Sequence, residues 1–233
     1  MTLLSARGLT RHFGGLRAVD GVDFDLTQGE IHALIGPNGA GKTTFVSLLS
    51  GRLPVQSGTI VFNGQDITRL PAHRRVALGI AYTFQITSIY AGLSVYDNVA
   101  LAVQRVRPRD LGRATLAALA RVGLEGRAGQ VAGTLAYGHQ RLLEIAMGLA
   151  LLPRLLILDE PTQGLANAEI DGFKALVRGM VGQTTVLLIE HNMEVVMDLA
   201  DRITVLDAGQ VLASGSPAEV RANQAVQTAY LGV

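Results

Sequence analysis

The residues with the clearest chemical pattern lie at positions 36–44, where the sequence reads Gly-Pro-Asn-Gly-Ala-Gly-Lys-Thr-Thr. This stretch matches G-x-x-x-x-G-K-[ST], the phosphate-binding loop. Its glycines allow backbone amides to turn toward phosphate oxygens. Lys42 can reach the β- and γ-phosphates, and the Thr43 hydroxyl can ligate Mg²⁺. The sequence therefore predicts a site for a nucleoside triphosphate and Mg²⁺, formed by Gly36, Pro37, Asn38, Gly39, Ala40, Gly41, Lys42, Thr43 and Thr44.

The segments on either side of this loop have the patterns that a phosphate-binding loop requires. An apolar run, Ile31–Ile35, precedes it and is typical of a buried strand. A helix-compatible run, Thr44–Leu49, follows it, and Gly51 is expected to end that helix. The alternative is a chance glycine turn before a helix. Strand, loop and helix in this order favour the phosphate-binding interpretation.

Two adjacent carboxylates, Asp159 and Glu160, follow another apolar run, Leu155–Leu158. Such a run is typical of a strand buried on both faces. Because side chains alternate along a strand, the two carboxylates are expected to point in different directions. We expect Asp159 to face the Mg²⁺ held by Thr43, and Glu160 to polarise the attacking water. The alternative is a solvated acidic strand end, which is the commoner use of an Asp-Glu pair.

Composition sets limits on the rest of the chain. It has 233 residues, 48% of them hydrophobic, a net charge of +1 and no cysteine. A strongly basic field that would attract nucleic acid is absent, and so is a disulfide framework. The longest central apolar run, Ile145–Leu152, is far shorter than the roughly 18–20 residues that span a bilayer. We therefore expect a chain that binds no nucleic acid and does not itself cross a membrane.

Alternating short apolar runs and turns predict an α/β core whose first part includes an antiparallel β layer. The expected strands are 3–9, 22–26, 31–35, 57–62, 80–84, 155–158, 185–189, 203–206 and 211–214. Helices are expected at 44–49, 71–78, 95–103, 114–122, 135–152, 168–178 and 193–200, with a short one after Ser216-Pro217.

The pattern changes in the middle of the chain. Residues 86–152 are rich in alanine and leucine and are mostly helical in pattern. We expect them to form a helical subdomain inserted into a core made of residues 1–85 and 153–233. Because both ends of the insertion return to core strands, we treat residues 1–233 as a single domain.

Taken in order, these motifs resemble those of the ATP-binding subunits of ABC transporters, over essentially all of the chain. The phosphate loop and Asp159-Glu160 stand in the family's order with five further elements. These are Phe13, Gln85, the stretch Leu135-Ala136-Tyr137-Gly138-His139-Gln140, Gly164-Leu165-Ala166 and Glu190-His191. The resemblance implies a P-loop NTPase (RecA-like) core with an antiparallel β subdomain and a helical insertion that carries the ABC signature.

The resemblance also implies roles for single residues. Phe13 stacks on adenine; Gln85 contacts Mg²⁺ or the water; His191 contacts the γ-phosphate and is coupled to Glu160. The implied catalytic residues are Glu160, His191 and Gln85, and the implied metal ligands are Thr43, Gln85 and Asp159. Each has an ordinary alternative when taken alone: a core aromatic for Phe13, a solvated strand end for Gln85 and a structural histidine for His191.

The signature residues would act on nucleotide bound to another subunit. In the family two chains sandwich two ATP molecules head to tail, and the usual signature is Leu-Ser-Gly-Gly-Gln. Here Ala136, Tyr137 and His139 replace the serine, the first glycine and the glutamine, while Leu135 and Gly138 remain. Amides at the start of the following helix can still face a phosphate.

Further stretches resemble the ATPase of branched-chain amino-acid uptake systems. They are 81–87, 136–146, 189–193 and 229–232. This resemblance implies an importer for branched-chain or other hydrophobic amino acids, amides or urea. The implied partners are membrane permease subunits, a second ABC ATPase in a heterodimer (a homodimer being the alternative) and, indirectly, an extracytoplasmic solute-binding protein. The implied location is the cytoplasmic face of the inner or plasma membrane.

Two other functions are compatible with an ATP-binding cassette. One is an exporter of lipid or lipopolysaccharide. The other is a soluble assembly ATPase, which usually needs a long coiled-coil insertion or tandem ATPase units, and this chain has neither. Neighbouring genes for permeases and a solute-binding protein would distinguish import from export.

Overall fold

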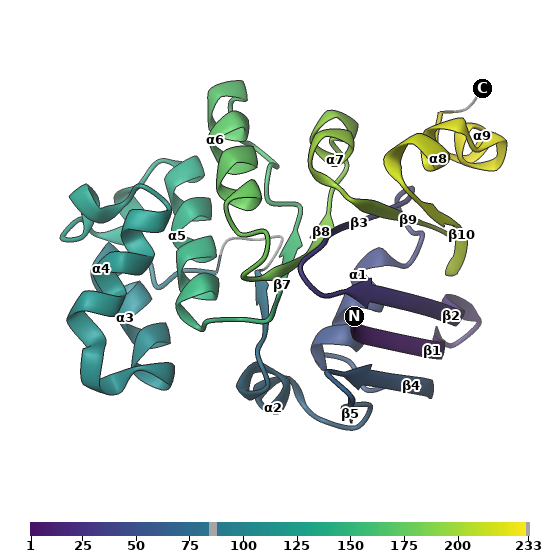
Figure 1. The fold of residues 1–233 in the computed structure, drawn as a ribbon, viewed down its shortest axis with the longest axis horizontal. Coiled ribbons are helices and arrows are strands. Elements are labelled where there is room, and N and C mark those ends of the chain that lie inside the picture. Colours follow the sequence, from purple (N-terminus) through teal and green to yellow (C-terminus); the bar gives the residue numbers. More distant parts are fainter. Residues whose placement is uncertain (84–87, 232–233) are drawn as a thin grey trace.

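In the computed structural model, which describes residues 1–83 and 88–231, two sheets lie side by side with helices around them (Figure 1). The larger has six strands in the order β10-β9-β3-β8-β7-β6. Strands β9, β3, β8, β7 and β6 run parallel, and β10 pairs antiparallel with β9. Their bounds are β3 Ile31–Ile35, β6 Ile80–Thr83, β7 Leu155–Asp159, β8 Thr185–Ile189, β9 Arg202–Asp207 and β10 Gln210–Gly215.

The smaller sheet is the antiparallel β layer that the sequence predicts, with the order β2-β1-β4-β5. Its strands are β1 Thr2–Phe13, β2 Leu16–Thr27, β4 Ser57–Phe62 and β5 Gln65–Asp66. The first two are longer than predicted. Their pairing continues through register shifts, one of them between Ala6 and Leu9, so the glycine at position 8 does not end the strand.

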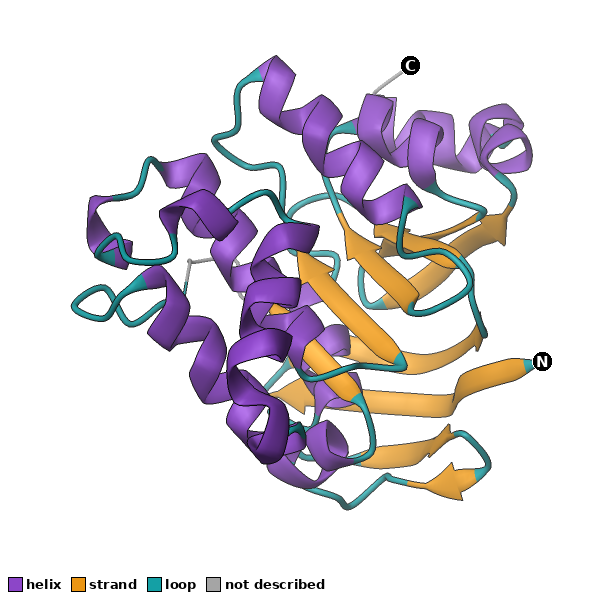
Figure 2. Cartoon of the chain, turned by 60° about the vertical axis from the view of Figure 1, so that its left-hand side comes forward, coloured by secondary structure: helices purple, strands orange, loops and turns teal. Residues whose placement is uncertain are grey.

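Helices cover both faces of the parallel sheet, as Figure 2 shows from a second direction. They are α1 Lys42–Ser50, α2 Ala72–Ala77, α3 Val95–Val106, α4 Leu111–Arg121, α5 Tyr137–Ala150, α6 Asn167–Arg178, α7 Met193–Leu199, α8 Pro217–Ala222 and α9 Gln224–Leu231. Three short 3₁₀ turns lie at Pro108–Asp110, Glu125–Arg127 and Ala132–Thr134. None of the helices in the described ranges has the length and apolar character needed to span a bilayer.

The helical segment that the sequence predicts lies at one side of the molecule, where α3, α4 and α5 pack together (Figure 1). The first helix ends later and the second begins earlier than predicted, since α3 continues to Val106 and α4 begins at Leu111. Helix α5 begins two residues later than predicted, after Ala136. The predicted boundary between residues 85 and 86 falls outside the described residues, so this division of the chain remains a prediction.

The strands β3, β7 and β8 are buried throughout and mostly apolar, because each face of the sheet contacts a different core. In β7, Leu156 and Leu158 pack into the cluster shared with α3, α4 and α5. Leu155 and Ile157 pack into the cluster around α1 and the antiparallel sheet. A third cluster joins β3 and β9 to α7, α8 and α9. Burial on both faces leaves the chemistry of these strands to the residues that follow their ends.

The C-terminal end of α1, the helix after the phosphate loop, is held by a buried cation. Arg75 is only 1% exposed and donates to the carbonyls of Leu48 and Leu49 at 2.7 and 2.8 Å. It also donates to the carbonyls of Thr68 and Leu70 at 3.1 and 2.8 Å. The last carbonyls of a helix lack intrahelical donors, so the guanidinium supplies donors in their place. Burial lowers the pKa of Arg75 to about 10, which leaves it charged at neutral pH.

We predict that Arg75→Met lowers the free energy of unfolding by about 2–4 kcal/mol, because several buried carbonyls lose their donor together. Arg74→Met is the matched control, since Arg74 is exposed on the same helix and should change stability by no more than about 0.5 kcal/mol. Urea denaturation of both variants measures the difference. Equal stability of the two variants would contradict this role for Arg75.

Candidate functional site

Three neighbouring strands of the parallel sheet bring the predicted motifs to one edge. Leu34 in β3 lies opposite Ile189 in β8, and Ile189 lies opposite Asp159 in β7. The strands are parallel, so their carboxyl ends coincide. The phosphate loop follows β3, Glu160 follows β7, and His191 lies two residues beyond β8. The fold therefore gathers at one edge residues that are up to 155 positions apart.

The phosphate loop packs tightly against the neighbouring chain, and this explains its glycines. Gly41 has φ +99°, and a Cβ on it would lie 2.1 Å from the carbonyl oxygen of Ala18 in β2. No other residue type fits there without moving the antiparallel sheet. Helix α1 begins immediately afterwards at Lys42, so its unpaired amides point toward the loop.

Lys42 lies folded into the loop. Its Nζ donates to the carbonyls of Gly36 at 2.7 Å and Pro37 at 3.0 Å. Burial lowers the pKa of Lys42, while the negative charges of Glu160 and Asp159 oppose that shift. A buried ammonium beside two carboxylates and a ring of backbone amides is suited to an anion such as a triphosphate.

Asp159 is the last residue of β7 and is 2% exposed. One of its carboxylate oxygens accepts a hydrogen bond from the hydroxyl of Tyr82 in β6. Burial raises the pKa of Asp159, and the bond from Tyr82 partly offsets that rise. Tyr82 thus orients the carboxylate, a role that sequence reasoning missed. Its only sequence signal is its place near the end of a strand that pairs with β7.

Glu160 and His191 meet beyond the ends of their strands. Oε1 of Glu160 lies 2.8 Å from Nε2 of His191. Glu160 has φ +49°, in the left-handed region that non-glycine residues rarely adopt. Its amide donates to the carbonyl of Ile189 at 2.9 Å. The two carboxylates have different partners, since Asp159 accepts from the hydroxyl of Tyr82 and Glu160 contacts His191.

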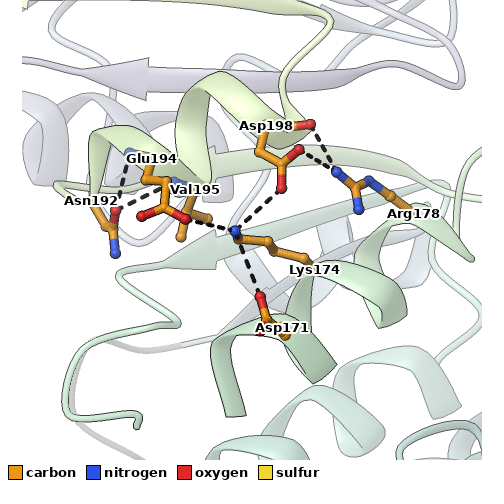
Figure 3. Close-up of polar contacts among 7 residues, drawn as sticks. All are labelled: Asp171, Lys174, Arg178, Asn192, Glu194, Val195 and Asp198. Carbon is orange, nitrogen blue, oxygen red and sulfur yellow. Dashed lines mark hydrogen bonds and ion pairs between the residues drawn. The ribbon is translucent and has the colours of Figure 1, made fainter. Parts of the chain in front are cut away.

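His191 precedes a helix that is fixed at both of its ends. The Asn192 side chain accepts from the amides of Glu194 and Val195 at 3.1 and 3.3 Å and caps α7. Lys174 of α6 contacts Glu194 and Asp198 of α7, each at 3.2 Å (Figure 3). These contacts hold α7 against α6 and so fix the helix that begins after His191.

Of the predicted site residues Phe13 and Gln85, the structure describes only Phe13. Phe13 ends β1 with 44% of its surface exposed, so it is not the core aromatic that was its alternative. The guanidinium of Arg11 lies 4.9 Å from the centre of its ring. Its stacking on a base stays a prediction. Gln85 lies outside the described residues.

The signature segment packs against the Gly164-Leu165-Ala166 turn of the same chain. A Cβ on Gly164 would lie 2.9 Å from the Tyr137 ring. A Cβ on Gly138 would lie 2.1 Å from Oε1 of Glu169, whose Oε2 accepts from the amide of Ala166 at 2.8 Å. A Cβ at Gly138 would therefore displace the Glu169 carboxylate from its place between α5 and the first turn of α6. Leu135 is buried, His139 is half-buried, and Ala136 and Tyr137 are exposed at the start of α5.

Comparison with known proteins identifies this arrangement. Residues 19–163 match the model described as ABC transporter, so the chain belongs to the ABC transporter ATP-binding family. Residues 210–233 match a model described as branched-chain amino acid ATP-binding cassette transporter. The fold and the ATPase class that the sequence predicts are thereby confirmed.

Curated relatives cover nearly the whole chain. The chain is 39% identical to the high-affinity branched-chain amino acid transport ATP-binding protein BraF of Pseudomonas aeruginosa, over 99% of this chain and 98% of that protein. It is also 39% identical to LivG of Escherichia coli, described in the same words, with the same coverage. Among solved structures, the ADP conformation of the cassette MJ1267 matches with a TM-score of 0.89, 25% identity and full coverage of both chains.

We predict that Gly138→Ala destabilises the protein by about 1–2 kcal/mol, because Glu169 must leave its bond to the Ala166 amide. In a Glu169→Ala background the same change should cost about 1 kcal/mol less, as a double-mutant cycle of unfolding free energies would show.

Gly172→Ala is the control for this cycle, since a Cβ at this position of α6 meets nothing within 4 Å. It should leave stability unchanged or raise it by up to about 1 kcal/mol. An identical cost of Gly138→Ala in both backgrounds would show that Glu169 is not the reason for the glycine.

Proposed function

We propose that this chain is the ATP-hydrolysing subunit of an importer for branched-chain or related hydrophobic amino acids. The Glu160–His191 pair, held beside the phosphate loop, is the observation that supports hydrolysis. Glu160 polarises the attacking water, and His191 holds Glu160 and contacts the γ-phosphate. Lys42 stabilises charge on the transferred phosphoryl group.

Mg²⁺ fits the donor set of this site. The Asp159 carboxylate and the Thr43 hydroxyl are oxygen ligands, which Mg²⁺ prefers. It is usually held by one or two carboxylates together with substrate phosphates, rather than by a cage of protein ligands. No cluster of three or more His, Asp or Glu side chains suited to a metal occurs in the described part of the chain, and this form of binding needs none. Bound Mg²⁺ would neutralise charge between the β- and γ-phosphates.

The likeness to BraF and LivG, whose names describe branched-chain amino acid transport, supports the proposed substrate. We infer permease subunits, a second ATPase that completes a heterodimer, and an extracytoplasmic solute-binding protein acting through the permeases. The chain would sit at the cytoplasmic face of the membrane. Its relatives give no support to the lipid exporter or the soluble assembly ATPase that the sequence left open.

The catalytic assignment is tested with two variants in the assembled transporter. Glu160→Gln should retain ATP binding and lose at least about 90% of turnover, because an amide keeps the shape but does not activate water. Lys42→Ala should weaken ATP binding as well, because the ammonium contacts phosphate directly. ATP binding and the hydrolysis rate are measured for both variants. Near-normal hydrolysis by Glu160→Gln would remove this residue from the mechanism.

The signature predicts that the two ATP sites are unequal. Ala136 lacks the hydroxyl that the usual serine would donate to the partner's γ-phosphate. A hydrogen bond to a charged group contributes about 1.5–3 kcal/mol, so the site completed by this signature should turn over about ten- to a hundredfold more slowly. The site built on Lys42 and Glu160 should be the faster one.

Disabling the catalytic glutamate of each subunit in turn measures this difference, and Ala136→Ser should raise the rate of the slow site. The alternative is that amides from Tyr137 to His139 suffice. Equal losses from the two knockouts, with no gain from the serine, would establish that alternative.

A further inference from the structure

Glu190 is a buried carboxylate beside the candidate site. The sequence analysis assigned no role to this residue. It follows β8 directly and is 3% exposed. A buried carboxylate is costly unless its oxygens are hydrogen-bonded. In this chain each of the two oxygens has two donors, and each oxygen contacts a different turn.

The first turn is the one that follows Glu160. Oε1 of Glu190 accepts from the amide of Thr162 at 2.9 Å and from the hydroxyl of the same residue. Oε2 accepts from the amides of His191 at 2.9 Å and Asn192 at 3.1 Å. All four groups are donors. A carboxylate can satisfy them all, whereas a glutamine would turn its NH₂ group toward one pair.

The two turns joined in this way carry the two residues that meet at the candidate catalytic pair. Glu160 stands two residues before Thr162, in a left-handed backbone conformation with φ +49°. Such a conformation persists only where the surrounding structure holds it. His191 belongs to the second turn, and its ring lies 2.8 Å from the Glu160 carboxylate. A change in the spacing of the two turns would therefore change this contact.

We propose that Glu190 is a positioning residue for ATP hydrolysis: its buried carboxylate ties the turn after Glu160 to the turn at His191 and keeps this pair in contact. Its four hydrogen-bond donors all belong to the two turns themselves. The proposal deepens the function proposed above and rests on it for its catalytic consequence. The geometric consequence does not depend on ATP, so the two are tested separately.

The geometric test uses the full chain without nucleotide. The chain has five histidines, so the ring ¹⁵N resonances of His191 can be assigned by substitution. Glu160→Ala, which lacks the contact, gives the reference position of the Nε2 resonance. Glu190→Gln should move this resonance most of the way to the reference at the same pH. Thr162→Val, which removes only the hydroxyl donor, should move the Nε2 resonance part of the way. This second variant keeps the test possible if Glu190→Gln does not fold.

The matched control is Glu30→Gln. Glu30 accepts from the amide of Thr27 at 2.7 Å and lies 3.1 Å from a ring nitrogen of His32, just before β3 begins. It stands at the amino end of that strand, the end opposite the candidate site. The control makes the same charge change on a hydrogen-bonded carboxylate and should leave the His191 resonance in place.

The catalytic test measures kcat and KM for ATP in the assembled transporter. Glu190→Gln should lower kcat about tenfold or more and leave KM within about twofold, because misplacement of the pair affects the reaction and not nucleotide binding. An unchanged His191 resonance in Glu190→Gln would overturn the proposal, and so would a kcat like that of Glu30→Gln. If the resonance moves while the wild-type complex hydrolyses no ATP, the proposed function fails and the geometric role of Glu190 stands.

Discussion

The structure depends on one constraint, the coincidence of the carboxyl ends of β3, β8 and β7. Each strand is buried on both faces and mostly apolar, so its place in the sheet is set by burial rather than by the polar residues that follow it. Register between the strands then determines the spacing of the phosphate loop, Asp159-Glu160 and Glu190-His191. The packing of the core therefore also determines the geometry of the site. A shift of one strand along its neighbour would separate the Glu160 and His191 side chains.

The charged side chains at this edge are held by groups of their own chain. Lys42, Asp159 and Glu190 are all buried, and each is held by groups of its own chain: loop carbonyls, the Tyr82 hydroxyl, and the amides of two turns. Burial of charge is unfavourable, so such a site is stable only when its partners are fixed by the fold. Fixed dipoles stabilise a transition state without reorganising during the reaction, which is the main source of catalysis in phosphoryl transfer.

Much of the fold and part of the candidate site could be predicted from the sequence. Local patterns gave the order of nearly every strand and helix, because apolar runs and glycine turns report burial and chain reversal directly. The phosphate loop, Asp159, Glu160 and His191 could be named because their motifs are short and ordered. The contacts of Tyr82, Glu169 and Glu190 could not, since each joins segments distant in sequence. Glu169 touches Gly138, and Glu190 binds Thr162, through geometry that only the folded chain defines. The left-handed backbone conformation of Glu160 could not be predicted either, because it also depends on the folded chain.

We infer that this edge holds Mg²⁺-ATP with its γ-phosphate between Lys42 and the Glu160–His191 pair. A crystal structure of the full chain with Mg²⁺ and a non-hydrolysable ATP analogue tests this most directly. Nζ of Lys42 should leave the carbonyls of Gly36 and Pro37 for the phosphates. Thr43 and Asp159 should lie at the metal, with Glu160 still in contact with His191. Nucleotide bound elsewhere, or Lys42 still bonded to the loop carbonyls beside an ordered γ-phosphate, would contradict it.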